Sequence, residues 1–140
     1  MKKVTLYLLL AVFCLGLIGC SNKDADVEAF ITENDAVMKD ITSKIDANPT
    51  AAGIDDAQKS FDAKKASLKS KWDAVKDARG AQVSAEMQKK LEDSMKKNGE
   101  ALTQTSTKNM MKLAQDRDAA MKFQKLMQDY SATFGQPAAK

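Results

Sequence analysis

The residue types that most often do chemistry in proteins are scarce in this chain. Its 140 residues contain no histidine, and both cysteines, Cys14 and Cys20, lie near the N-terminus. Histidine is the commonest general base and the commonest metal-binding side chain, so its absence disfavours both kinds of site. Acidic residues adjoin at Asp55-Asp56 and Asp116-Arg117-Asp118, but neither stretch has the spaced acids of a calcium loop. We therefore expect no catalysis, no metal and no cofactor, with an enzyme as the less favoured alternative.

Cys20 comes directly after the one long apolar run of the sequence. Lys2 and Lys3 precede residues 4–18, which carry no charge. The run is short for a membrane-spanning helix of about 20 residues but matches the apolar part of a secretory signal. Residues 1–19 are therefore interpreted as an export signal and excluded from the fold.

The stretch Leu17-Ile18-Gly19-Cys20 resembles the lipobox of bacterial lipoproteins. The resemblance covers the first twenty residues and implies cleavage between Gly19 and Cys20, with a diacylglycerol joined to the Cys20 sulfur as a thioether. Each buried acyl CH₂ contributes about 0.8 kcal/mol, so two or three chains would hold the protein on a membrane. An ordinary signal peptide and a retained membrane anchor are the less favoured alternatives.

Two further residues bear on where such a lipoprotein would act. In enteric bacteria an Asp after the lipidated cysteine tends to retain the protein in the inner membrane, so Ser21 implies the outer membrane, facing the periplasm. In a host with a single membrane the anchor would lie in the cell membrane. The terminal Lys140 resembles, in that one feature, the major murein lipoprotein, whose last lysine is joined to peptidoglycan. The partners implied are a protein of the envelope or peptidoglycan.

The mature chain would be nearly neutral and would form one domain. Cleavage leaves 121 of the 140 residues, and removal of Lys2 and Lys3 reduces the 22 basic side chains to 20 against 19 acidic ones. This balance offers no electrostatic footprint for nucleic acid. With the Cys20 sulfur acylated, no disulfide can form, so the core alone must hold the fold.

Helix-forming residues dominate the mature chain, and no stretch alternates as a strand would, so the sequence predicts an all-α fold. A first helix is expected over residues 24–47, ended by Asn48-Pro49, and a second over about 52–78, ended by Arg79-Gly80. The bundle domain should span residues 26–134, after a tether at 20–25 and before a flexible tail at 135–140.

Residues 83–132 allow two interpretations. Leu91, Leu102 and Leu113 recur every eleven residues, in one helical phase, which favours a single helix of about 50 residues. A break at Asn98-Gly99 is the alternative. The main prediction is an antiparallel three-helix bundle with a long or kinked last helix, and the alternative is a four-helix bundle.

Three features of the apolar stripes bear on function. Asn34 falls within the first stripe and is expected at its edge, in contact with water, rather than as a buried polar residue that sets helix register. Trp72 is expected in the core rather than stacked on a ligand. A third face is interpreted as core, or alternatively as an exposed surface for a partner; it comprises Met110, Leu113, Met127 and Tyr130.

The sequence thus predicts a membrane-anchored lipoprotein with a non-catalytic binding or structural role in the cell envelope. A carrier that holds an apolar ligand between its helices is the alternative. Neither the envelope process nor the identity of a partner follows from the residues.

Overall fold

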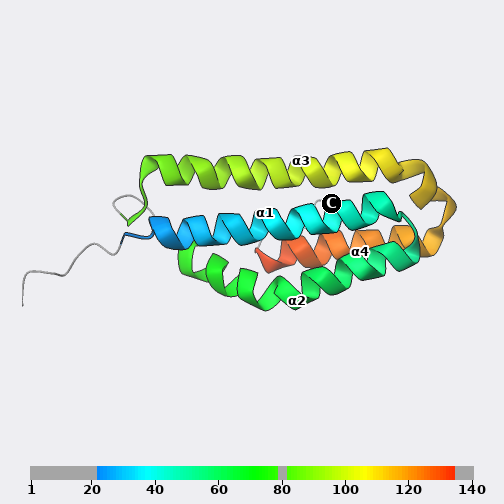
Figure 1. The fold of residues 1–140 in the computed structure, drawn as a ribbon, viewed down its shortest axis with the longest axis horizontal. Helices are drawn as coiled ribbons and strands as arrows, with labels where there is room; N and C mark the ends of the chain where they lie inside the picture. Colours follow the sequence, from blue (N-terminus) through cyan, green and yellow to red (C-terminus); the bar gives the residue numbers. More distant parts are fainter. Residues whose placement is uncertain (1–21, 79–81, 135–140) are drawn as a thin grey trace, which may run out of the picture.

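The computed structural model describes residues 22–78 and 82–134, which form an elongated bundle of four α-helices (Figure 1). The helices are α1 (Asp24–Ala47), α2 (Ala51–Val75), α3 (Ala85–Gln115) and α4 (Arg117–Thr133), and the described residues contain no strand. The predicted all-α class and helical bundle are confirmed. The signal, its cleavage at Gly19, lipidation of Cys20, the Arg79-Gly80 stop and the tail at 135–140 lie outside the described residues.

Helix α1 has the predicted bounds, and a tight turn joins it to α2. Asp24 and Asp26 lie in its first turn, where the helix dipole favours acids, and Pro49 prevents it from continuing. The turn folds closely over the start of α2. A Cβ atom placed on Gly53 would lie 1.9 Å from the carbonyl oxygen of Asn48, so the turn requires glycine at this buried position.

Helix α2 ends three residues earlier than predicted. The backbone N–H of Lys76 still donates to the Trp72 carbonyl at 2.7 Å, but the N–H of Ala78 donates to Val75, a shorter i→i−3 bond of 3.0 Å. The last turn therefore tightens and leaves the α-helical path. Ala78 itself is buried although it follows the helix.

The predicted single helix over residues 83–132 is wrong, because the chain breaks at Asp116. Helix α3 does continue through Gly99, as the main prediction held, so the alternative break at Asn98-Gly99 is also misplaced. Asp116 has an extended backbone, φ −120° and ψ 97°, and its Oδ1 accepts the N–H of Ala119 at 3.0 Å. An N-cap of this kind starts a new helix, so four helices form where three were predicted.

Helix α1 lies at the centre of the bundle (Figure 1). It packs most extensively against α2 and also against α3, whereas α4 folds back mainly onto α2. Consecutive helices run antiparallel, so that α1 and α3 run parallel. The largest fully buried side chains come from α1, α2 and α4: Val27, Phe30, Asn34, Met38, Ile41, Ile45, Ile54, Phe61, Leu68, Val75 and Leu126.

Candidate functional site

The predicted face of Met110, Leu113, Met127 and Tyr130 is divided between the surface and the core. Met110 is 62% exposed, whereas Leu113 is buried and Met127 and Tyr130 are half-buried against the core. Leu113 and Met127 are two seven-residue repeats apart, with Met110 and Tyr130 flanking that line, which places the four on one face only in a straight helix. The break at Asp116 separates Met110 and Leu113 from Met127 and Tyr130. They therefore do not form a single binding face.

Asn34 is fully buried, which corrects the expectation that it reaches water. Its Oδ1 accepts the hydroxyl of Tyr130 at 2.9 Å, and its Nδ2 lies 3.8 Å from the sulfur of Met95. The side chain thus joins α1 to α4 and α3 in the interior. Burial raises the pKa of Tyr130 to about 12, against the smaller opposing effect of the Asn34 hydrogen bond. Tyr130 is therefore a neutral hydrogen-bond donor at physiological pH.

Five rings form a cluster around this hydrogen bond, which we call the aromatic junction. Phe30 lies 5.3 Å from Trp72 and 5.7 Å from Phe134, measured between ring centroids. Phe134 also packs edge-on against Trp72 and Tyr130, and Tyr130 lies 5.8 Å from Phe61. Tilted and edge-on pairs at these distances are the favoured aromatic geometries. The junction binds α1, α2 and α4 together, and Trp72 belongs to it as well as to the pocket described below.

The contact between α1 and α3 has a different character, because α3 buries polar side chains there. Asp35 of α1 accepts the Ser94 hydroxyl at 2.6 Å and the Asn98 amide at 2.8 Å. We call this contact the polar seam. Its buried polar residues on α3 are Ser94, Asn98, Thr105 and Asn109.

A second carboxylate of α1 anchors the far end of the polar seam. Asp46 accepts from Asn109 and from the ammonium of Lys108, both at 2.8 Å. The hydrogen bond from Lys108 holds the pKa of Asp46 below its usual value, and burial opposes it. Asn109 also donates to the Thr105 carbonyl at 2.9 Å, so its amide is satisfied within the protein.

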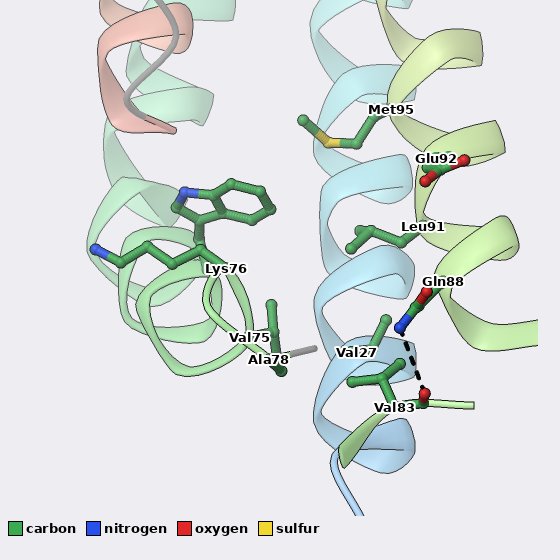
Figure 2. A pocket seen from close by; sticks show the side chains of 10 residues that line it. Val27, Val75, Lys76, Ala78, Val83, Gln88, Leu91, Glu92 and Met95 are labelled. Atoms are coloured by element: carbon green, nitrogen blue, oxygen red, sulfur yellow. Dashed lines mark hydrogen bonds between the residues drawn. The ribbon is translucent and has the colours of Figure 1, made fainter. Parts of the chain in front are cut away.

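A pocket of about 440 Å³ opens at the end of the bundle where α1 and α3 begin and α2 ends (Figures 1 and 2). It exists because α4 is short. With 17 residues, α4 is about 25 Å long, whereas the 24 residues of α1 extend about 36 Å. Beyond the end of α4, nothing among the described helices fills the space between α2 and α3.

The walls of this end pocket are apolar and its rim is polar. Figure 2 shows Val75 of α2 across the pocket from Leu91 and Met95 of α3, and Trp72 of α2 and Val27 of α1 complete the apolar part of the lining. The polar members are Lys76, Gln88 and Glu92. Asp73 already accepts a 2.8 Å hydrogen bond from the Lys76 ammonium, which raises the Lys76 pKa. The pocket therefore combines apolar side chains with the polar groups of Lys76, Gln88 and Glu92.

The two acidic stretches considered for metal binding share a lysine instead. Lys122 lies 2.6 Å from Asp55 and 3.2 Å from Asp118, which ties α2 to α4. These contacts raise the pKa of Lys122, the hydrogen bond to Asp55 most strongly. Within residues 22–78 and 82–134, no three histidine, cysteine or acidic side chains come together as a metal would need. A search of the same residues found no helix long and apolar enough to cross a membrane.

Comparisons with known proteins found no relative of this chain. No family model, no curated protein and no solved structure matches the chain. The function must therefore be argued from the residues and the geometry.

The end pocket was missed by sequence reasoning. The side of α3 that lines it was visible in the shared phase of Val83 and Leu91 with Met95, but that phase indicated a core face. Only the length of α4 leaves part of this face uncovered. The N-cap at Asp116 was the signal that could have revealed it, since an Asp before a new first turn is typical of a helix start.

Proposed function

We propose that this protein is a bacterial lipoprotein, held to a membrane through Cys20, whose helical bundle has a non-catalytic binding or structural role in the cell envelope. The observation that carries the proposal is the order of a basic start, an apolar run and Leu17-Ile18-Gly19-Cys20. The start of α1 at Asp24 is consistent with it, because only three residues would separate the lipid from the folded domain.

A short tether would orient the bundle on the membrane. The start of α1, the end of α2 and the start of α3 lie together at one end (Figure 1), which would face the lipid. The corner between α3 and α4 would lie farthest from it, about 46 Å away along the 31 residues of α3. Three exposed methionines lie on the helix segments next to that corner and would be offered to an envelope protein: Met110, Met111 and Met121.

The proposal is tested by metabolic labelling with palmitate in the bacterial host. The Cys20→Ala protein should accumulate as an unprocessed precursor without label. The matched control is Cys14→Ala, which removes the other cysteine of the same apolar run and should leave labelling and processing intact. Equal labelling of the Cys20→Ala and parent proteins would contradict lipidation at Cys20.

The site of action is part of the same proposal and has its own test. Ser21 supports sorting to the outer membrane, and Lys140 supports attachment to peptidoglycan. Membrane fractionation should place the mature protein in the outer membrane of a host that has one. Lysozyme treatment of washed sacculi should release the protein if Lys140 is joined to peptidoglycan, and no release would remove that part of the proposal.

A carrier of an apolar ligand is the second candidate, and the end pocket favours it. Apolar side chains of three helices line much of the pocket, which is open to solvent at the end of the bundle. Protein purified from its host would then carry a ligand that mass spectrometry detects after denaturation. A ligand-free preparation from the native membrane would count against the carrier.

A further inference from the structure

We infer that the end pocket binds a single acyl chain of a membrane lipid. Its volume of about 440 Å³ lies within the range of about 300–1,000 Å³ typical of small-molecule sites. Three helices bound it, so that a ligand would be enclosed on several sides rather than laid on a flat face. The inference deepens the carrier role proposed above.

The chemistry of the walls selects an apolar ligand. Val27, Val75, Leu91 and Met95 line the space together with Trp72, and Figure 2 shows Val75 across it from Leu91. Lys76 is paired with Asp73, and the Gln88 amide points to the Val83 carbonyl at 3.5 Å. Lys76 is the one cation among the described lining residues and is paired, and Glu92 adds a carboxylate; the apolar side chains of the lining offer their contacts to a hydrocarbon chain. A polar head group could remain at the rim.

The shape of the pocket favours a linear chain. On α3 the lining runs from Gln88 to Met95, about 10 Å along the helix, and on α2 it runs from Trp72 past the end of the helix. Both walls belong to helices that extend along the bundle past the end of α4 at Thr133 (Figure 1). The pocket lies where a longer α4 would continue, and a hydrocarbon chain along the bundle axis can occupy that space. Met95, with its unbranched and adaptable side chain, suits a wall that must fit a flexible chain.

The position of the pocket identifies the source of the chain. Val27 belongs to the first turn of α1. The start of α1 is hydrogen-bonded to the loop before α3. The Lys23 N–H donates to the Gln82 carbonyl at 2.7 Å, and the Ser84 N–H donates to the Asp24 carboxylate at 2.8 Å. If Cys20 is anchored as proposed, the end of the bundle that holds the pocket lies next to the bilayer. A membrane lipid is then the nearest apolar ligand.

The test uses Trp72 as a reporter, since it is the only tryptophan of the chain and lies in the wall. The protein is produced from Ser21 onward, without Cys20; every buried residue of the core lies between Val27 and Phe134 and is retained. Dibromostearate, added below its micellar concentration, should quench Trp72 fluorescence and saturate at one equivalent. Unbrominated stearate should restore the fluorescence, and native mass spectrometry should show one stearate per protein.

Two matched variants locate the binding. Leu91 and Met87 are both half-buried on α3, one turn apart, but only Leu91 lines the pocket. Leu91→Glu should weaken the apparent affinity for dibromostearate at least tenfold, while Met87→Glu should leave it within about twofold. Circular dichroism and thermal unfolding establish that each variant is folded, and the stoichiometry and competition of the parent protein decide the question should Leu91→Glu unfold.

Several results would overturn the inference. They are the absence of quenching in the folded parent protein, equal quenching in Leu91→Glu and Met87→Glu, and quenching that appears only after residues 135–140 are deleted. The last result would show that the C-terminal segment, which follows Phe134 beside the pocket, occupies it instead. None of these results bears on lipidation of Cys20, which the palmitate experiment tests separately.

Discussion

The two sides of α1 make contacts of opposite kinds. Toward α2 and α4 it contributes Phe30 to the aromatic junction, and toward α3 it contributes Asp35 and Asp46 to the polar seam. Burial of aromatic rings provides large, non-directional stabilisation. A hydrogen bond adds only about 0.5–1.5 kcal/mol net, but a buried polar group left without its partner costs about 1–3 kcal/mol.

The aromatic junction and the polar seam are expected to have different effects on the fold. Each hydrogen-bonded pair across the polar seam is 59 to 63 residues apart in the sequence, and this offset stays nearly constant from one end of the seam to the other. A slide of α3 by one turn would separate every carboxylate of the seam from its amide or hydroxyl. We therefore expect the junction to supply most of the stability and the seam to select the register of α3 on α1.

The largest effect is expected from Phe30→Ala, which removes a fully buried ring from the junction. It should lower the free energy of unfolding by about 3–5 kcal/mol, measured by denaturant titration of the protein from Ser21 onward. Leu102→Ala, which removes a smaller buried side chain from α3, should cost less. A larger loss of stability from Leu102→Ala than from Phe30→Ala would show that the contact of α3, rather than the junction, supplies most of the stability.

Alkaline pH should weaken the junction through Tyr130. Its pKa is about 12 in the folded protein and about 10 when unfolded, so the folded state holds the proton more tightly. The stabilisation is complete below pH 10 and is lost as the pH rises from 10 to 12, a loss on the order of 2 kcal/mol.

Spectrophotometric titration of tyrosinate checks the Tyr130 prediction directly, because Tyr130 is the only tyrosine after Tyr7. Lysines also lose their charge at alkaline pH, and the hydrogen bonds to Asp55 and Asp118 raise the pKa of Lys122. The lysines ionise in the Tyr130→Phe variant as well, so the difference in unfolding free energy between the parent protein and this variant isolates the effect of Tyr130. A tyrosine pKa near 10 in the folded protein would show that Tyr130 is exposed to water.

A smaller loss is expected when the seam loses a carboxylate. Asp35→Ala leaves the buried Ser94 and Asn98 without their acceptor and should cost about 1–2 kcal/mol in unfolding free energy. The control is Asp93→Ala, since Asp93 is exposed on α3 and its removal should change stability by less than about 0.5 kcal/mol. Equal effects would deny the seam any role in stability.

The two methionines of the divided face should respond differently to truncation. Met127 is half-buried against the core, so Met127→Ala should cost about 1–2 kcal/mol, less than the 2–5 kcal/mol of a fully buried methionine. Met110→Ala should leave thermal stability nearly unchanged because this side chain is 62% exposed. If both variants lose stability equally, the two residues do share one buried face.

The smallest effect is a gain, from Gly99→Ala in the middle of α3. A Cβ atom at this exposed position would meet no atom within 4 Å, so alanine should stabilise the helix by about 0.5–1 kcal/mol. Ala114→Gly on the exposed side of the same helix should act in the opposite direction. A loss of stability with Gly99→Ala would indicate that α3 is not helical at this residue.

Local signals predicted most of the helices. The apolar stripe and Asn48-Pro49 predicted α1, whose observed bounds agree with the prediction. The same reasoning missed the break at Asp116, because Leu113 and Met127 kept a sevenfold spacing across it. Periodicity indicates which residues face the core, but it does not distinguish one straight helix from two helices that each present an apolar face to the same core.

The amino-acid sequence alone was sufficient for the all-α class, the bounds of α1 and the continuity of α3 through Gly99, because each depends on neighbouring residues. The anchor at Cys20 stays a prediction from a short motif. The burial of Asn34, the polar seam and the end pocket depend on side chains more than 35 residues apart. Asn34 is buried because the Tyr130 hydroxyl of a distant helix satisfies its oxygen, and the pocket is open because α4 ends short of α1 and α2. Such features arise only when the helices pack, since tertiary contacts choose which of several compatible faces meet.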